Sequence, residues 1–317
     1  MAEIGDRSTF LGATDVVAIC GLSPFASPLD VWLEKTGQRG QKPDNPTLRR
    51  GRLLEPVVAQ LYSEDEQAEL VPVERLHMAG KPYLAASPDR LRVEPAILVE
   101  IKTHRAYIRD QYGDPWTDAV PEHILGQITW QMHVARHASP ALVLEPYGHV
   151  AAWFDATEFG IWRVEYDEDL AERMEARADA FWHDCVLADV PPQAIGHPAE
   201  LEALRQVYPR STETVIRADE ECEDAIRHLR QARQELAEAE ERVTRWTAIV
   251  QQAMGEAGAM DSGEGRITWR TSKPVVRRGC DYDGLRAAHP NIYEQYVNET
   301  TIEGSRRFCV PRNWSNT

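Results

Sequence analysis

The alternation of apolar and polar residues along the chain predicts six helical stretches. In each stretch, apolar side chains return every three or four residues, the spacing that lines one face of an α-helix. The expected helices cover residues 13–20, 28–35, 48–62, 121–135, 168–186 and 219–257. Pro56 stands inside the third stretch, so we expect it either in the first helical turn or at a bend.

Shorter stretches rich in β-branched and aromatic residues predict strands between these helices. The expected strands cover residues 70–78, 83–86, 91–93, 96–102, 141–145, 150–155, 159–164 and 266–270, with 306–310 as a candidate partner of the last. This order of helices and strands is typical of a mixed α/β domain, and prolines at 191, 192 and 198 mark its expected end. We therefore divide the chain into an α/β domain (1–195), a helical, coiled-coil-like segment (196–258) and a C-terminal β-containing extension (259–317).

The long helical segment carries an apolar seam near heptad spacing. Leu229, Leu236, Val243 and Val250 belong to this seam, and charged residues fill most of the remaining positions. A solvated helix commonly packs such a seam against its own chain. The alternative is that the seam associates with a second copy of the chain or with a partner helix.

The overall charge lowers the expectation of nucleic-acid binding without excluding it. The formal net charge is −16, whereas phosphate contacts need Lys and Arg. Basic runs nevertheless occur at 49–52 and 266–278, and a carboxylate cluster becomes less negative once it holds a divalent cation. We find no membrane-length apolar stretch, no signal peptide and no CxxC pair among the five cysteines. We therefore expect an intracellular protein with reduced cysteines.

The most informative pattern is a charged pair on an expected strand. Because strand side chains alternate, Glu100 and Lys102 share one face, and apolar neighbours occupy the opposite face. Asp89 stands just before the preceding strand, so a hairpin can bring its carboxylate beside Glu100. Two carboxylates and the backbone carbonyl of Ile101 suit a hard cation. Lys102 could orient or deprotonate a water there, helped if burial or nearby cations lower its pKa. The alternative is an exposed cross-strand pair of charges.

Two further motifs flank this pair. Upstream, RGRLLEP (50–56) places Glu55 on a helix among apolar neighbours. Downstream, PEHILGQITWQM (121–132) places Gln127 and Gln131 one helical turn apart, so both amides can face the same site. An amide there can hydrogen-bond a water or the lysine without adding charge. Taken singly, the glutamate could be a surface residue and each glutamine a solvated one.

Together these motifs resemble those of the PD-(D/E)XK nucleases. Pro88-Asp89, followed ten residues later by VEIK (99–102), is similar to the signature itself. The stretch around Glu55 resembles the GxxxEP element, and PEHILGQ resembles the P-x-x-x-x-x-Q helix. Residues 12–25 and 29–37 are similar to the opening of YqaJ-like proteins, although Thr14 stands where that pattern usually has Ser. The chain is therefore identified as a member of the YqaJ-like viral recombinase and lambda-exonuclease family.

The resemblance implies a fold and a set of site residues. The fold is a restriction-endonuclease-like core with a central mixed β-sheet flanked by helices, extended here by a C-terminal long helix and a small β element. The implied catalytic residues are Glu55, Asp89, Glu100, Lys102 and Gln127; the implied ligands of Mg²⁺ or Mn²⁺ are Glu55, Asp89, Glu100 and Ile101; the implied substrate-binding residues are Arg7, Thr14 and Gln131. Arg7 and Thr14 match the spacing of an arginine and a hydroxyl that bind a 5′-phosphate in lambda-type enzymes.

The resemblance also implies a function. It indicates 5′-to-3′ digestion of linear duplex DNA in phage-type recombination, leaving 5′-phosphates, in the cytoplasm of a bacterial or phage-infected host cell. A ring-shaped trimer and a RecT- or beta-type single-strand annealing partner are implied as well. An endonuclease of the same superfamily and a non-catalytic DNA-binding or assembly protein stay open as alternatives. Glycoside hydrolysis fits poorly, because a lysine two residues from the acid is not needed there.

Overall fold

The computed structural model describes residues 7–39, 45–155, 157–274 and 279–298. The chain forms two compact units, residues 1–209 and 210–317, each of which is described by itself. The first unit includes α6 (Glu200–Val207), which lies beyond the predicted domain end at residue 195.

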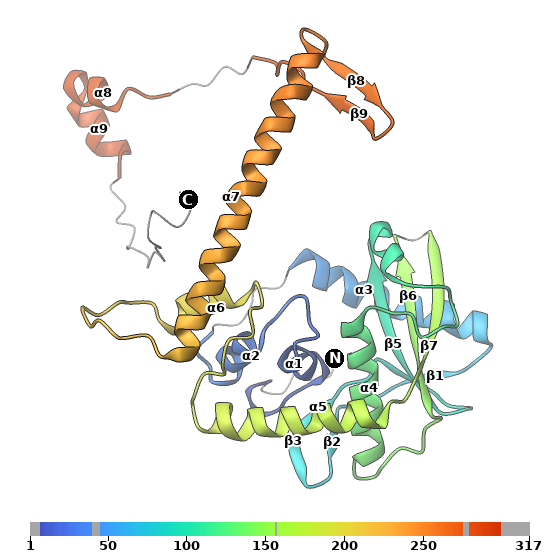
Figure 1. The fold of residues 1–317 in the computed structure, drawn as a ribbon. Helices are drawn as coiled ribbons and strands as arrows, with labels where there is room; N and C mark the ends of the chain where they lie inside the picture. Colours follow the sequence, from blue (N-terminus) through green and yellow to red (C-terminus); the bar gives the residue numbers. More distant parts are fainter. Residues whose placement is uncertain (1–6, 40–44, 156, 275–278, 299–317) are drawn as a thin grey trace. The chain divides into compact units, whose positions relative to one another are not determined.

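A five-stranded mixed sheet forms the centre of the first unit (Figure 1). Its strands are β1 (Leu70–Pro72), β4 (Arg90–Arg92), β5 (Ile97–His104), β6 (Tyr147–Phe154) and β7 (Glu158–Glu165). They lie in the order β1-β4-β5-β6-β7, and only β5 and β6 pair in parallel. The predicted fold class, a mixed sheet flanked by helices, is confirmed.

Helices cover both faces of this sheet, so side chains on both sides of β5 are buried. Val99 and Ile101 pack in one apolar cluster with α3 (Pro46–Glu66). Leu98 packs in another cluster with α4 (Glu122–His137), on the opposite face. The alternation of β5 therefore directs Glu100 and Lys102 toward α4, because they share their face with Leu98.

Helix α3 begins earlier than the predicted start at residue 48. Asn45 caps α3 by accepting a hydrogen bond from the Leu48 N–H at 2.8 Å, and Pro46 occupies the first turn, where a missing N–H costs little. Pro56 consequently lies in the helix interior. Of the two places predicted for Pro56, the first turn is excluded, because the helix already begins at Pro46.

Two strand predictions are also wrong. The stretch 70–78 is not one strand, because Pro72 ends β1 and the chain then forms β2 (Leu76–Met78), which pairs with β3 (Lys81–Ala86) in a separate two-stranded sheet. Residues 141–145 form no strand. Their backbone N–H groups bond instead to the carbonyls of Ala135 in α4 and Ala96.

The remaining helices of the first unit pack beside α4 and beside one another. They are α1 (Ala13–Ile19), α2 (Pro28–Lys35), α5 (Glu168–Phe181) and α6, with a π-helical turn (Trp182–Leu187) after α5 and short 3-10 helices at Arg7–Thr9 and Ala106–Gln111. Ser27 and Asp30 form a capping box at the start of α2, in which each side chain accepts a backbone hydrogen bond of the other residue.

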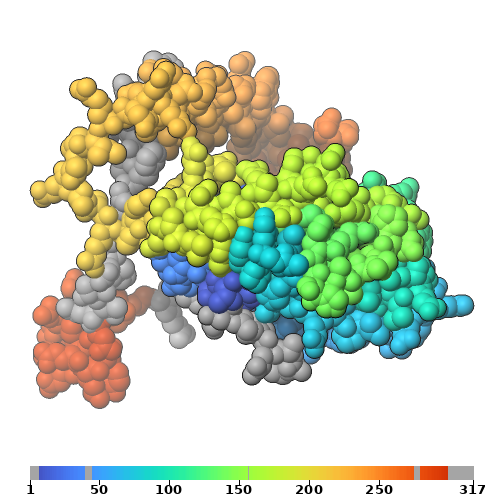
Figure 2. Space-filling view, turned by 90° about the horizontal axis from the view of Figure 1, so that it is seen from below, coloured from blue at the N-terminus to red at the C-terminus, as the bar shows by residue number. Residues whose placement is uncertain are grey.

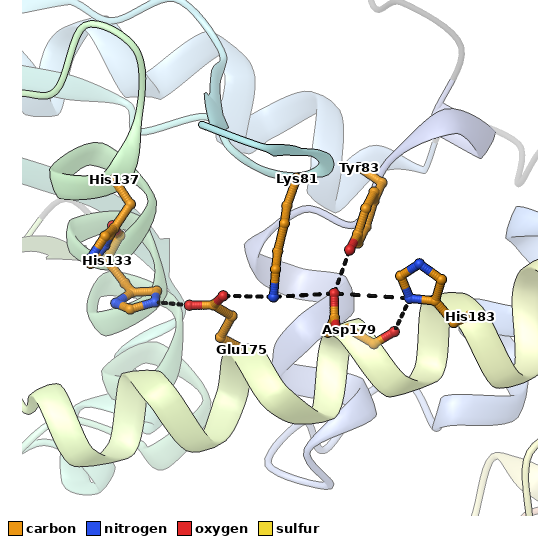
Figure 3. Close-up of polar contacts among 7 residues, drawn as sticks. All are labelled: Lys81, Tyr83, His133, His137, Glu175, Asp179 and His183. Carbon is orange, nitrogen blue, oxygen red and sulfur yellow. Dashed lines mark hydrogen bonds and ion pairs between the residues drawn. The ribbon is translucent and has the colours of Figure 1, made fainter.

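A polar network outside the sheet fixes α5 to the β2–β3 hairpin and to α4 (Figure 3). Lys81 Nζ lies 3.0 Å from Glu175 and 3.3 Å from Asp179, and the Tyr83 hydroxyl donates to Asp179. His133 Nε2 of α4 lies 2.7 Å from the second Glu175 oxygen. In Figure 2 the hairpin, coloured cyan, accordingly lies against α5, coloured yellow-green.

The second unit is dominated by one long helix. Its elements are α7 (Glu220–Met254), β8 (Ala259–Ser262), β9 (Gly265–Thr268), α8 (Tyr282–Ala288) and α9 (Pro290–Tyr296). The predicted long helix and small β element are confirmed. The partner of β9 is β8, in an antiparallel hairpin that pairs Ala259 with Thr268. The predicted partner stretch, 306–310, lies outside the described residues.

Candidate active site

The β4–β5 hairpin brings Asp89 and Glu100 together. Arg90 pairs with Val99 in the antiparallel register, so Asp89, just before β4, stands level with Glu100. The Ile101 N–H donates a hydrogen bond to Asp89 Oδ2 at 2.8 Å. Because the N–H and C=O of one strand residue point to the same side of the strand, the Ile101 carbonyl is directed toward this side as well.

The face of α4 that meets β5 supplies two amides to the same acid. Gln127 Nε2 donates to Glu100 Oε1 at 2.5 Å, and Gln131 Nε2 donates to Glu100 Oε2 at 2.7 Å. Lys102 Nζ donates to Glu100 Oε1 at 2.5 Å and to Gln127 Oε1 at 2.9 Å. Helical and strand periodicity thus bring four of the predicted site residues into one hydrogen-bonded cluster.

Burial excludes the alternative of an exposed pair of charges. Glu100 is 2% exposed, and the Lys102 side chain is 22% exposed. A buried carboxylate is costly unless it is paired and hydrogen-bonded, and Glu100 has partners on both oxygens. The cluster is therefore a buried polar site that opens on the side of Lys102.

The charges within the cluster shift two pKa values upward. Burial raises the pKa of Asp89 well above its usual range, and the neighbouring Glu100 charge raises it further. For Lys102, burial favours the neutral amine, but the charges of Glu100 and Asp89 outweigh it and raise the pKa of the ammonium. A lowered pKa, which would help Lys102 to deprotonate a water, is therefore not found in this arrangement, because two carboxylates lie close to its amine.

Glu55 does not join the other two acids. Its carboxylate accepts a hydrogen bond from Arg90 NH1 at 2.7 Å. Arg90 is the cross-strand partner of Val99, so its side chain lies on the α3 face of the sheet, away from Glu100. Glu55 is close enough for its charge to contribute to the raised pKa of Asp89. Of the three acids in the predicted ligand set, the fold brings Asp89 and Glu100 together, whereas Glu55 lies with Arg90.

The donor set fits a magnesium-like cation without Glu55. Across residues 7–39, 45–155, 157–274 and 279–298, no group of three or more His, Cys, Asp or Glu side chains is arranged to hold a metal ion. Mg²⁺, however, keeps several waters and needs only one or two carboxylates besides substrate phosphates. Asp89, Glu100 and the Ile101 carbonyl could hold such an ion. A divalent cation would also offset the repulsion that raises the pKa of Asp89.

The two residues predicted to bind the 5′-phosphate lie in the N-terminal helices. The Arg7 side chain is 52% exposed and lies 3.9 Å from Asp15 and 3.6 Å from Glu34. Thr14 is exposed in the first turn of α1. No contact recorded for the described residues joins Arg7 or Thr14 to the cluster around Glu100.

The helical spacing of α4 and the strand alternation of β5 also place two histidines on the faces that carry Gln127 and Lys102. The sequence analysis missed both. On α4, His123 precedes Gln127 by one turn, and on β5, His104 follows Lys102 on the same strand face. Burial, and then the Lys102 charge, lowers the pKa of His123 and holds that of His104 at about 4. His104 Nε2 bonds the Tyr112 hydroxyl at 2.7 Å. Counting four residues back from Gln127 and two forward from Lys102 would have found both.

The β4–β5 hairpin and α4 thus bring together the motif residues Asp89, Glu100, Lys102 and Gln127. Residues 4–138 match the model of the YqaJ-like viral recombinase domain. The resemblance to YqaJ-like viral recombinases that the sequence motifs indicated is thereby confirmed over this stretch. Protein YqaJ of Bacillus subtilis (strain 168) is 24% identical over 313 residues, which span 96% of this chain and 92% of that protein.

Solved structures of exonucleases are similar in fold. The alkaline exonuclease LHK-Exo of Laribacter hongkongensis is 18% identical, with a TM-score of 0.44 over 58% of this chain and 91% of that one. Its complex with dAMP has a TM-score of 0.43 at 19% identity, over 64% and 95% of the two chains. A phage related exonuclease from Haemophilus somnus 129PT is 10% identical, with a TM-score of 0.43 over 57% and 96%.

No helix among the described residues is long and apolar enough to cross a membrane.

Proposed function

We propose that this chain is a Mg²⁺- or Mn²⁺-dependent deoxyribonuclease that digests linear duplex DNA from 5′ to 3′ and leaves 5′-phosphates. The observation that carries the proposal is that Asp89 and the buried Glu100 lie together, with Lys102 bonded to Glu100 at 2.5 Å. Two carboxylates beside a single lysine leave a net negative charge that is costly for folding, so this arrangement favours a catalytic role. The match of residues 4–138 to the YqaJ-like viral recombinase domain supports phage-type recombination as the setting.

Each residue of the cluster has a distinct task in this proposal. Asp89, Glu100 and the Ile101 carbonyl would hold the cation, which when bound polarises the scissile phosphate and lowers the pKa of the attacking water. Lys102, as an ammonium, donates hydrogen bonds that orient the water and the phosphate. Gln127 and Gln131 fix the Glu100 carboxylate without adding charge.

We propose that a basic stretch at the start of α3 contacts the DNA backbone. A Cβ at Gly51 would lie 3.8 Å from Thr103 Oγ1, so this stretch lies beside the end of β5 that follows Lys102. A hollow of about 410 Å³ opens here, lined by Asn45, Pro46, Arg49, Arg50, Leu53 and Leu54. Its two guanidinium groups suit phosphate oxygens. We propose that Arg7 and Thr14 bind the 5′-phosphate.

The test is hydrolysis of 5′-end-labelled linear duplex DNA with Mg²⁺ or Mn²⁺. We expect wild-type protein to release labelled mononucleotide early, and Lys102→Ala to release none above background. Lys81→Ala is the matched control, because Lys81 is a paired lysine of the same unit whose partners lie on α5. Intact substrate with the wild type, or equal activity of the two variants, would refute the proposal.

Two further outcomes separate the alternatives within the proposal. Cleavage of closed circular DNA, or a ladder of internal fragments, would assign endonuclease activity instead. We also propose a trimer acting in the bacterial or infected cytoplasm with a RecT- or beta-type annealing protein. Co-purification of this chain with such an annealing protein tests the association. Comparing the wild type with Lys102→Ala would show whether the association depends on catalysis.

A further inference from the structure

Helix α7 presents a regular heptad seam of apolar and small residues. Residues Cys222, Leu229, Leu236, Val243 and Val250 recur every seven positions and form the a row. Residues Ala225, Ala232, Ala239, Trp246 and Ala253 follow each of them by three positions and form the d row. This repeat spans the helix, whose 35 residues extend about 50 Å at 1.5 Å per residue.

Among the described residues of the second unit, none covers the seam. Leu236, Val243 and Trp246 are 58%, 65% and 58% exposed. Of the residues of α7, only Met254, at the last position, is buried. Exposed apolar rows of this length indicate a helical partner.

We propose that α7 pairs with α7 of a second copy of this chain in an antiparallel coiled coil. Core packing favours this direction over the parallel one. In an antiparallel pair each a residue meets a d residue, so Leu236 packs against Ala239 of the second copy and Leu229 against Trp246. Large side chains then meet small ones in most layers. A parallel pair would stack Ala on Ala in four layers, and such layers leave gaps at the normal helix separation.

The charges beside the seam favour the same direction. Arg233 and Glu240 occupy e positions, and Glu235 and Arg242 occupy g positions. In the antiparallel register just described, Arg233 faces Glu240 of the second copy, and Glu235 faces Arg242. The two-fold symmetry makes each contact twice, which gives attraction at every charged site. In a parallel pair, Glu235 would instead face Glu240 of the second copy, and both contacts would repel.

These groups are available for pairing. In the part of α7 that the structure describes, no ion pair within 4 Å occupies Arg233, Glu240 or Arg242. Glu235 accepts only a hydrogen bond from the exposed Gln231 amide, at 2.9 Å. The neighbouring Asp224, by contrast, already binds Arg227. Among the described residues, the four charges that the antiparallel register would use are thus not held by other ion pairs.

A charge reversal distinguishes the two directions. Glu240→Arg places Arg beside Arg233 of the second copy in the antiparallel pair, and we expect the dissociation constant of the dimer to rise about tenfold. In a parallel pair the same change would relieve the Glu235–Glu240 repulsion and tighten the dimer. Glu241→Arg is the matched control, because it makes the same charge change at an f position on the outer face. Arg233→Glu combined with Glu240→Arg should restore the wild-type value.

The measurement is sedimentation equilibrium of the full chain at several concentrations. The proposal is overturned if the chain stays monomeric, if Glu240→Arg tightens association, or if Glu240→Arg and Glu241→Arg behave alike. If the chain instead formed a trimer through contacts of the first unit alone, Glu240→Arg and Glu241→Arg would behave alike. The α7 pair depends neither on nuclease activity nor on the proposed trimer, because Glu240→Arg against Glu241→Arg tests α7 alone. Its failure and that of the proposed function are therefore separate outcomes.

Oxidative cross-linking gives a second, geometric readout. Cys222 is exposed and, in the antiparallel register, faces Ala253 of the second copy. Under oxidation, Ala253→Cys should form a 222–253 link between chains, identified by peptide mapping. A parallel pair would instead link 222 to 222 in the wild type and 253 to 253 in the variant. Either of these links, or the absence of any α7 link, contradicts the proposal.

Discussion

Lys102 and Gln127 are hydrogen-bonded to each other at 2.9 Å and share Glu100 Oε1 as an acceptor. The three side chains come from a strand and from the helix that covers it, so the triangle depends on the packing of α4 onto β5. Gln127 is the member that carries no charge. In the proposed mechanism it holds the ammonium and the carboxylate in place and does not itself react.

Replacing Gln127 by Leu should therefore reduce nuclease activity while the fold persists. Groups that orient a metal-binding carboxylate typically contribute 10–100-fold to activity, so a loss of about that size is expected. Initial rates on linear duplex DNA at saturating Mn²⁺ provide the measurement. Gln60→Leu is the matched control, because Gln60 is exposed on α3 and bonds only to Glu64 among the described residues. Equal rates for the two variants would show that Gln127 has no positioning role.

Asp89→Asn should stabilise the protein while it abolishes activity. The pKa of Asp89 is raised, chiefly by burial and then by Glu100, so keeping Asp89 ionised at neutral pH destabilises the folded state. Asparagine removes this charge, and its side-chain oxygen can still accept from the Ile101 N–H. We expect the melting temperature to rise by roughly 2–4 °C, the scale that corresponds to about 1 kcal/mol in a domain of this size. A lower melting temperature in metal-free buffer would contradict this reasoning.

Much of this site could be predicted because two short periodicities determine it. Strand alternation places Glu100 and Lys102 on one face, and helical spacing places Gln127 and Gln131 on another. The hairpin turn then brings Asp89 level with Glu100. These relations are local along the chain, and each needs only the correct assignment of one or two elements.

The parts that could not be predicted depend on contacts between distant elements. Arg90 binds the Glu55 carboxylate because α3 packs on the face to which β4 turns the Arg90 side chain, and no spacing in the sequence reveals how α3 and β4 meet. The raised pKa of Lys102 likewise depends on how close two folded carboxylates lie. In the fold, the split of residues 70–78 into two sheets was missed for the same reason. The pairing of β9 with β8 is instead local, and it was missed because Ala259–Ser262 was not predicted to be a strand.

The pairing of Glu55 with Arg90 leads to a graded prediction for metal binding. Asp89→Asn should raise the dissociation constant for Mn²⁺ by more than about tenfold, since it removes a ligand of the buried pair. Glu55→Gln should raise it by less than about tenfold, because Arg90 already neutralises this carboxylate. Isothermal titration of metal-free protein with Mn²⁺ gives both values. An effect of Glu55→Gln as large as that of Asp89→Asn would make Glu55 a full ligand and show that it leaves Arg90 on binding.

His149 should contribute to the loss of stability in acid. It is 2% exposed on β6, and its Nδ1 lies 2.7 Å from the Tyr62 hydroxyl. Burial, with the charges of Arg92 and Arg163, lowers the pKa of His149 to about 4, below its ordinary value of 6.5. The unfolded chain therefore binds a proton more readily than the folded one between these values, and the free energy of unfolding falls as the pH drops from about 6.5 to about 4. At 1.36 kcal/mol per pKa unit, the full loss is about 3 kcal/mol.

Urea unfolding at several pH values tests this contribution. The free energy of unfolding should fall less in acid for His149→Gln than for the wild type. Tyr62→Phe, which leaves the imidazole in place, should keep the pH dependence while lowering stability at every pH. Parallel curves for His149→Gln and the wild type would assign the acid sensitivity to other groups.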